Sequence, residues 1–470
     1  MFNSKSRKTL LFFSLFITVL LNAQQGEYFI IENVILEGNK QTKDIVIFNE
    51  LDLFPGDTIY LNQFPNHKLL NEKRLLSTAL FTGVEINIKN WNVEKKEGDI
   101  HIVMQENWYV YPSLIFELAD RNFNVWWSEM NRDFSRVNYG LGIDHINLTG
   151  RKDKLRLKVQ HGYTRKYEIK YDYPYLSRAW GAFGEIFYAN QKEIGYRTVE
   201  NKIIFEQLED ERVMLQRFRT GFALKHRPDV FNFHEFKLEY HHNQIDEFVA
   251  QELNPDYFLN GATDLRFFTL KYDYLYDRRI FNLYPEGGYL FLLNVRKEGL
   301  GIFNEFNNLS VAAAFEKYYK MGSNWYWGGR IKAKSNLIRN QIAYANNTGL
   351  GYGNDVVRGY ELYVVDGTDY LLAKSSLRFK IFETNKNWGK YMLLPQFKRM
   401  NMRVFLRANL DFGYVNEPTY KESNTLNNRV LIGYGPAFDM LLYHTYILSL
   451  EYSFNHLGES GLFIQSTFNF

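Results

Sequence analysis

Apolar and polar residues alternate along most of the chain with a repeat of two. In the segment 446–454 (YILSLEYSF), the apolar side chains share one face, and the opposite face carries Ile447, Ser449, Glu451 and Ser453. The segment 404–414 (VFLRANLDFGY) also has one apolar face, and its other face carries Arg407, Asn409 and Asp411. This period predicts β-strands, because successive side chains of a strand point to opposite faces.

The polar face carries charges in strand after strand, as in 166–173 (KYEIKYDY), 234–240 (HEFKLEY) and 377–382 (LRFKIF). A half-buried soluble sheet also alternates. A barrel with a polar lumen and an apolar outer face, however, accounts for the repeated charges and for the many Tyr and Phe residues that would form its girdles. The chain ends on GLFIQSTFNF, as bacterial outer-membrane barrels commonly do; its apolar face holds Leu462, Ile464, Phe468 and Phe470.

We therefore predict a mainly β fold: a transmembrane antiparallel β-barrel of about 16 strands over 108–470. The sequence marks sixteen or seventeen candidate strands in this region and no convincing helix. An even number is expected for this class of barrel. In 183–228, two or three strands fit equally well.

The chain before residue 108 follows a different pattern. Lys5, Arg7 and Lys8 precede the apolar run 10–21, which predicts a secretory signal peptide over 1–23; an uncleaved anchor helix is the alternative. Residues 28–107 then form a small α+β domain in the order β-α-α-β-β, with Thr42 as a plausible helix N-cap. Its predicted elements are a strand at 29–38, helices at 44–51 and 66–80, and strands at 84–89 and 99–106.

The amino-acid composition narrows the class of protein further. Aromatic residues make up 17% of the chain and Pro only 10 positions, a balance that suits β-structure. Mean hydropathy is −0.36, and beyond the N-terminus no apolar run approaches the roughly 20 residues of a transmembrane helix. The absence of cysteine excludes disulfides, thiol nucleophiles and Cys-ligated metals. Removal of the three basic residues with the signal peptide leaves a net charge of +3 − 3 = 0, which gives no indication of nucleic-acid binding.

Several motifs resemble those of one protein family and occur in the same order along the chain. ILEGNKQTKDIVI (35–47) and RLLSTALFTGVEINI (74–88) are similar to the motifs of a periplasmic POTRA domain. In the barrel region, the similar turns are Asn147-Leu148 with Gly150, Tyr171 with Pro174, and YDYLYDRRIFNLYPEGG (272–288). The chain thus resembles the BamA/TamA superfamily of outer-membrane insertases and transporters, which combine POTRA domains with a surface-antigen-type barrel.

The most specific similarity lies in GYGNDVVRGYEL (351–362), whose Val357, Arg358, Gly359 and Tyr360 resemble the tip of the family's long sixth extracellular loop. The resemblance implies that this loop, about 339–369, folds back into the barrel and that acidic residues of the inner wall hold Arg358. A guanidinium suits this task because it offers five donors in a rigid fork. An ordinary surface loop with a solvated arginine is the alternative.

The inner-wall motif of the family matches Phe405, Asp411 and Gly413 in VFLRANLDFG. One wall position departs from the family. Ser376, two residues before Arg378, stands where the family usually has Glu, so the acidic surroundings of Arg358 are expected to be half complete.

Other chemistry is weakly indicated. GLGYG (349–353) lacks the Lys-Ser/Thr of a phosphate loop, and His234, His241 and His242 fit lumen or loop positions better than a metal site. No GxSxG motif is present. A barrel phospholipase stays possible because its residues would be scattered, but nothing points to it. We therefore expect neither an enzyme nor a cofactor.

The resemblance implies an outer-membrane insertase or translocase. Its POTRA domain, in the periplasm, would receive unfolded outer-membrane or secreted proteins, with periplasmic chaperones or accessory lipoproteins as possible partners and outer-membrane lipid around the barrel. The seam would lie between the first strand, 109–118 with Tyr109 and Leu118 at its ends, and the last, 462–470. A single POTRA domain suggests either a narrower set of clients than the main assembly factor has or a translocator of the partner-secretion type. The alternative is a channel or structural barrel without a protein client.

Overall fold

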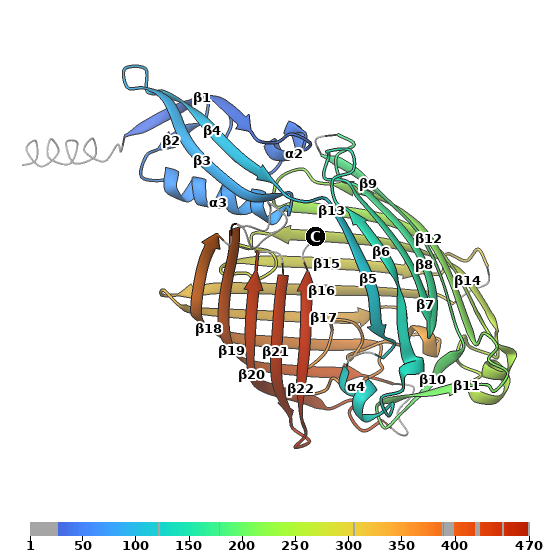
Figure 1. The fold of residues 1–470 in the computed structure, drawn as a ribbon. Helices are drawn as coiled ribbons and strands as arrows, with labels where there is room; N and C mark the ends of the chain where they lie inside the picture. The colour runs from blue at the N-terminus through green and yellow to red at the C-terminus, as the bar shows by residue number, and fades with distance from the viewer. Residues whose placement is uncertain are drawn as a thin grey trace, which may run out of the picture.

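The computed structural model describes residues 27–120, 123–177, 179–303, 306–387, 389, 399–418, 424–443 and 446–468. The predicted signal peptide and Phe470 lie outside the described residues. Two sheets dominate the structure, a small one near the N-terminus and a large one that curls into a barrel (Figure 1). In the described residues, no helix is both long and apolar enough to cross a membrane.

The N-terminal domain is a four-stranded mixed sheet packed against a helix. Its sheet order is β2-β1-β4-β3, with β1 parallel to β4 and the other pairs antiparallel. The elements are β1 (Tyr28–Glu37), α2 (Asp44–Phe48), β2 (Thr58–Tyr60), α3 (Phe64–Ser77), β3 (Phe81–Asn92) and β4 (Glu97–Glu106). Alternate apolar residues of the sheet and the inward side of α3 form one buried core; it includes Phe29, Ile31, Leu75, Ile100 and Ile102.

Two expectations for this domain need correction. The short edge strand β2 was missed, because three residues are too few to show a period. Thr42 is not the N-cap of α2: Lys43 holds that position without a side-chain capping bond, and the Thr42 hydroxyl instead lies 3.0 Å from the Tyr109 hydroxyl.

The large sheet has 16 antiparallel strands, which confirms the predicted fold class. The strands are β5 (Val110–Leu118), β6 (Val137–His145), β7 (Lys154–Gly162), β8 (Thr164–Tyr173), β9 (Trp180–Gln191), β12 (Leu215–His226), β13 (Asn232–Ile245), β14 (Asp264–Asp277), β15 (Gly288–Glu298), β16 (Asn308–Met321), β17 (Trp325–Asn336), β18 (Asp369–Asn387), β19 (Arg399–Asn416), β20 (Val430–Leu442), β21 (Tyr446–Asn455) and β22 (Ser460–Phe468).

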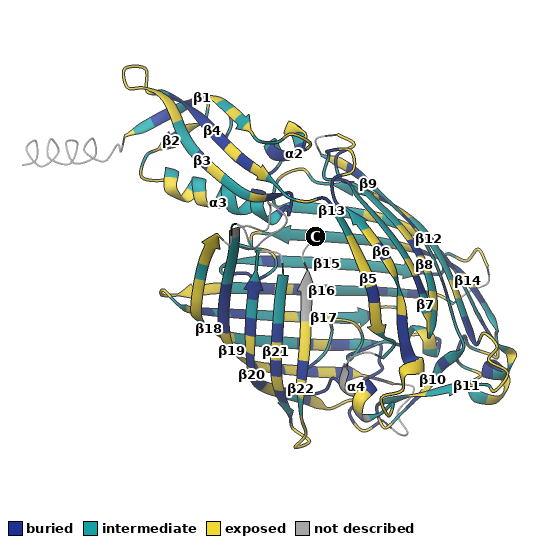
Figure 2. Cartoon of the chain, viewed as in Figure 1, coloured by how far each residue is buried: buried dark blue, intermediate teal, exposed yellow. Residues whose placement is uncertain are grey.

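Exposure follows the alternation that the sequence predicts. Leu270 and Leu406 are 47% and 51% exposed on the outer face, whereas Glu239 and Asp411 are buried on the inner face. Buried positions recur at every second residue along most of β20 (Figure 2). The charged face therefore lines the lumen, and the apolar face is the outer surface of the barrel.

The ambiguous region 183–228 holds two barrel strands, β9 and β12, and a separate hairpin between them. This hairpin consists of β10 (Glu193–Val199) and β11 (Lys202–Gln207), which pair only with each other in the described structure. The prediction of no helix beyond residue 108 was wrong for short segments. These are α4 (Phe123–Ser128), η1 (Phe134–Arg136), η2 (Val249–Leu253) and η3 (Tyr344–Asn346).

Candidate functional site: the lumenal loop, its wall and the seam

The loop at 337–368, between β17 and β18, lies against the inner wall of the barrel. Leu350 and Val365 form an isolated bridge within the loop, with hydrogen bonds of 2.9 and 2.8 Å, and so close off the segment that carries Arg358. An apolar cluster joins the loop to the wall; its loop members are Leu350, Val357, Tyr360 and Val365, and other members include Tyr370, Leu372, Val415 and Leu431. The predicted motif is therefore placed inside the barrel.

Arg358 contacts two buried carboxylates from two different strands. Its Nη1 lies 2.7 Å from Asp411 Oδ1 on β19, and its Nε lies 3.2 Å from Glu451 Oε1 on β21. The backbone N–H of Arg358 also donates to Asp411 Oδ2 at 3.2 Å. The two carboxylates are 0% and 1% exposed, so both depend on cationic partners.

The expectation that Arg358 has only one acidic partner was wrong. Ser376 lies apart from the loop tip, and its hydroxyl donates to the Gly328 carbonyl at 3.5 Å. The second carboxylate comes instead from Glu451. The alternation had placed Glu451 on the polar face, but no pattern in the sequence pairs it with a loop so far away along the chain.

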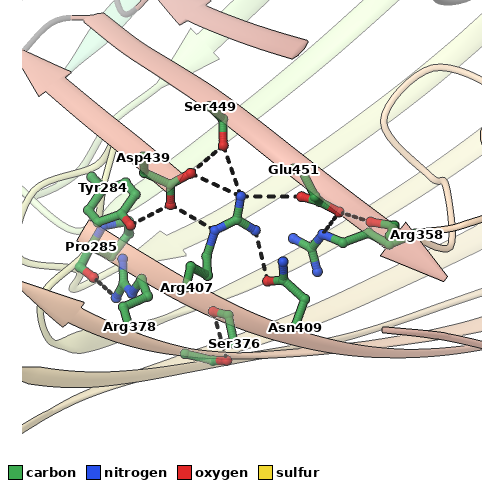
Figure 3. Close-up of polar contacts among 12 residues, drawn as sticks. Tyr284, Pro285, Arg358, Ser376, Arg378, Arg407, Asn409, Asp439, Ser449 and Glu451 are labelled. Atoms are coloured by element: carbon green, nitrogen blue, oxygen red, sulfur yellow. Dashed lines mark hydrogen bonds and ion pairs between the residues drawn. The ribbon is translucent and has the colours of Figure 1, made fainter. Parts of the chain in front are cut away.

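A second arginine links neighbouring strands of the same wall. Arg407 Nε lies 2.7 Å from Asp439 Oδ2, and its Nη2 lies 3.3 Å from Glu451 Oε2 (Figure 3). Glu451 is therefore shared between Arg407 of the wall and Arg358 of the loop. Lys374 approaches Asp411 Oδ2 at 3.6 Å from the neighbouring strand β18. Each carboxylate that holds the loop thus has a second cation.

Glycines allow the loop tip to approach the wall closely. A Cβ on Gly433 would lie 1.6 Å from the Arg358 carbonyl oxygen, and one on Gly413 would lie 2.4 Å from Cγ2 of Val357. Gly359 has a φ of +82° and itself approaches the backbone of Phe454. Only glycine leaves room for backbone contact of this kind. Gly413 was predicted as a wall residue, whereas Gly433 was missed.

A turn from the opposite end of the barrel also reaches into the lumen. It joins β14 to β15 within the motif 272–288. The Tyr284 hydroxyl donates to Asp439 at 2.7 Å, and the Pro285 carbonyl accepts from Arg378. Phe405, predicted as a wall partner of the loop, packs against the Tyr284 ring at 4.8 Å between centroids. Asp439 is therefore contacted from both the turn and the wall (Figure 3).

Glu50 fastens the N-terminal domain to the barrel. Its carboxylate, 5% exposed as a residue, lies 3.1 Å from Lys152 Nζ and 2.8 Å from Arg227 Nη1, both on turns of the barrel. Burial opposes ionisation of Glu50, but these two cations outweigh burial and lower its pKa to about 2. The group is therefore ionised throughout the neutral range.

A second contact links the same domain to the start of the barrel wall. Thr42 lies 3.0 Å from the Tyr109 hydroxyl and accepts a hydrogen bond of 3.0 Å from the Asn147 amide. Tyr109 directly precedes β5, so the domain is held at the first barrel strand (Figure 1).

The two end strands of the large sheet are β5 and β22. Every other barrel strand pairs with two neighbours, whereas β5 pairs only with β6, and β22 only with β21, among the residues that the structure describes. α4 follows β5 in the chain and contacts β22. Leu118 ends β5, and Leu462 and Phe468 lie in β22, whereas Tyr109 lies just outside β5.

No cluster of three or more His, Asp or Glu residues in the described part of the chain is arranged to hold a metal ion. The polar groups of the lumen contact one another instead. The site therefore offers charged contacts between the loop and the wall, and two strand edges without a strand partner in the described structure.

Together, the fold and the lumenal site define a class: a sixteen-stranded barrel with a small N-terminal domain and a long loop fixed to the inner wall by an arginine. The chain is similar in structure to BamA from Haemophilus ducreyi lacking POTRA domains 1–3, with 14% identity over 93% of this chain and 84% of that chain, and a TM-score of 0.51. It is also similar to CdiB from Escherichia coli, with 11% identity, 94% and 76% coverage, and a TM-score of 0.55.

No protein-family model matches the chain, and no curated protein matches it by sequence. The structural likenesses confirm the fold that the sequence resemblance predicted: the chain forms a barrel of the BamA and CdiB type.

Proposed function

We propose that the protein is an outer-membrane insertase or translocase for protein clients. In this proposal, the N-terminal domain acts as a POTRA domain in the periplasm and receives an unfolded client, which the barrel then assembles or passes at its seam. The protein acts through binding alone, without a covalent step. The observation that carries the proposal is the pair of end strands, β5 and β22, which have no strand partner at the seam in the described structure.

Free strand edges are costly in a membrane. Backbone N–H and C=O groups need partners where water is absent, and a strand edge is the template on which another strand adds. Addition through backbone hydrogen bonds tolerates many side chains, so one seam would serve clients of different sequence. Because no nucleotide is available in the periplasm, the free energy would come from folding of the client.

The place of the N-terminal domain supports delivery to this seam. Its contacts with Tyr109 and Asn147 hold it beside the start of β5. Its own sheet ends on β3, a twelve-residue strand whose only strand partner in the described structure is β4. A client strand added to β3 would need to travel only within this region to reach the seam.

The contents of the lumen argue against a plain channel. The loop with Arg358 lies on the inner wall, and the turn with Tyr284 enters from the other end. On the loop side, Leu362 meets α4 and β11 around a small cavity, so loops also approach one another across that mouth. This arrangement favours exit of a client at the seam over passage along the lumen.

Site-specific photocrosslinking in living cells tests the proposal. A crosslinking residue at Leu114 of β5 or at Ile464 of β22, 85% and 64% exposed, should capture unfolded outer-membrane or secreted proteins. Leu238, 45% exposed on the distant strand β13, is the matched control and should capture few. Equal capture at all three positions, or none together with normal outer-membrane protein levels in a deletion strain, would refute the proposal and favour a channel or structural barrel.

A further inference from the structure

A cavity of about 690 Å³ lies between the N-terminal domain and the barrel. α3 and the segment before it form one wall, and the turns that join β6 to β7, β12 to β13 and β14 to β15 form the other. Its volume falls within the range of roughly 300 to 1,000 Å³ that is usual for ligand sites. It opens between the domain that we propose receives clients and the barrel that we propose handles them.

Cations outnumber carboxylates in the lining. Its six cations are Lys73, Arg74, Lys152, Arg227, Arg278 and Arg279. Its three carboxylates are Glu50, Asp52 and Asp277, which leaves a surplus of 6 − 3 = 3 positive charges. Such a surplus in a partly enclosed space favours the entry of an anion.

Carboxylates just outside the lining do not remove this surplus. Glu286 contacts Lys73 at 3.4 Å but is shared with Arg403, and Glu316 contacts Arg279 at 3.1 Å but is shared with Arg330. These two carboxylates each bring a further cation with them, whereas Asp229, whose charge acts on Arg227, lowers the surplus to 3 − 1 = 2.

Two guanidinium groups from separate parts of the molecule meet on one aromatic ring. The Cζ of Arg74, on α3, lies 5.1 Å from the centroid of Phe231, and that of Arg278, on the barrel, lies 4.4 Å from it. The two carbons are therefore at most 5.1 + 4.4 = 9.5 Å apart. Asp52 pairs with Arg74 at 2.9 Å, but in the described part of the chain no carboxylate pairs with Arg278.

The strand residues that line the cavity belong to the inner face of the barrel. Phe233 and Leu275 line it, whereas Phe236 and Leu270, at the opposite parity of the same strands, are exposed on the outer face. Membrane lipid would cover the outer face, so the anion would come from the aqueous side. A rigid guanidinium fork suits a carboxylate, and the phenyl rings of the lining suit apolar side chains next to it.

We propose that this cavity binds acidic side chains of an extended polypeptide, so that the protein favours clients in which carboxylates alternate with apolar residues. The inference rests on the proposed function, because it takes the occupant to be a client on its way from the N-terminal domain to the seam. Arg278 is the principal contact, since its guanidinium lies on aromatic rings but pairs with no carboxylate in the described part of the chain.

Peptide binding to the purified full-length protein tests this inference. A fluorescent peptide of alternating Glu and Leu should bind, more weakly as salt is raised, and peptides with Gln or Lys in place of Glu should bind at least about tenfold more weakly. Arg278→Gln should weaken binding of the Glu peptide about tenfold, the effect of losing one charged hydrogen bond. Arg266→Gln, at the other end of β14 and paired with Asp264, is the matched control and should leave binding unchanged.

A charge-reversal variant distinguishes a change in peptide preference from a loss of protein stability. Arg278→Glu should shift the preference from the Glu peptide toward the Lys peptide, which an unfolded protein would not do. Equal binding of the Glu and Gln peptides, or no effect of Arg278→Gln, would overturn the inference. Binding of inorganic phosphate that depends on Arg278, without binding of the Glu peptide, would also overturn it and would assign the cavity to a free oxyanion. Client capture at Leu114 in the absence of peptide binding would leave the proposed function intact and remove only the inference.

Discussion

Replacement of Arg358 by alanine should release the lumenal loop from the wall. The substitution removes the guanidinium that lies 2.7 Å from Asp411 and 3.2 Å from Glu451, both almost fully buried. Loss of one partner from a buried ion pair costs about 3 to 5 kcal/mol. The lower end applies here, because Lys374 and Arg407 remain beside the two carboxylates.

A cost of about 3 kcal/mol corresponds to an increase of roughly a hundredfold in the population of the released loop. The natural absence of cysteine makes this measurable. Val357, 1% exposed, becomes a reporter as Val357→Cys, whose reaction with a hydrophilic maleimide requires the loop to open. The labelling rate in the Arg358→Ala background should rise about a hundredfold over the reporter alone. Arg358→Lys keeps the charge but loses the fork, so its rate should lie between these two.

Arg339 in the same loop provides the matched control. Its ion pair with Asp369 is solvent-accessible, with the arginine side chain 56% exposed, and such pairs contribute about 0 to 1 kcal/mol. Arg339→Ala should therefore change the labelling rate by less than about fivefold. Unchanged labelling in Arg358→Ala, or an equal effect in Arg339→Ala, would refute the assignment of Arg358 as the contact that holds the loop.

Four further predictions concern the contacts of the wall and the N-terminal domain. Gly433→Ala should raise labelling of Val357→Cys about tenfold, because its methyl group would lie 1.6 Å from the Arg358 carbonyl oxygen; Gly184→Ala, which meets open space, should leave labelling unchanged. Removal of the Tyr284 hydroxyl in Tyr284→Phe should lower the thermal stability of the barrel in detergent by about 1.5 to 3 kcal/mol, the value of a hydrogen bond to a charged group. Glu50→Gln should undock the N-terminal domain and speed hydrogen exchange in α2, since it removes the carboxylate that pairs with two partly buried cations. Because Lys152 and Arg227 hold the pKa of Glu50 at about 2, below the ordinary value of 4.5, the docking free energy should be complete above about pH 4.5 and decline as the pH falls toward 2; docking that is unchanged across this interval would contradict the role of Glu50.

The wall contacts form a path between the N-terminal domain and the lumenal loop. Lys73 of α3 contacts Glu286, and the same turn places Tyr284 on Asp439. Arg407 joins Asp439 to Glu451, which contacts Arg358. A continuous set of charged and polar contacts therefore extends from the N-terminal domain to the lumenal loop. Double-mutant cycles between Lys73 and Arg358 would measure whether the two ends are energetically coupled.

The fold could be predicted from the sequence because the alternation of side chains within a single strand shows which of them share a face. Each side chain alternates with its neighbour, so the lumenal positions of Asp411 and Glu451 could be read within single segments. The motif around Arg358 added the inward course of the loop through resemblance. Short elements such as β2 and α4 were missed, since neither is long enough to show a period.

The contacts between residues of the site could not be predicted in this way. A period of two fixes the face on which a side chain lies, but it does not fix which strands a loop will cross or how far it enters the barrel. The second carboxylate for Arg358 thus came from β21 rather than from the position of Ser376, and the entry of Tyr284 into the lumen was not foreseen.

The sequence by itself determined that this chain forms strands with a charged face and an apolar face, and that they close around a polar interior. Only the tertiary structure decided that Glu451 completes the contacts of Arg358 and that Glu50 fastens the N-terminal domain to two turns of the barrel. It also decided that β5 and β22 end the sheet, each with an outer edge that has no strand partner in the described residues. The physical reason is range: alternation is set by neighbouring residues, whereas charges pair across distances along the chain that only the folded barrel closes.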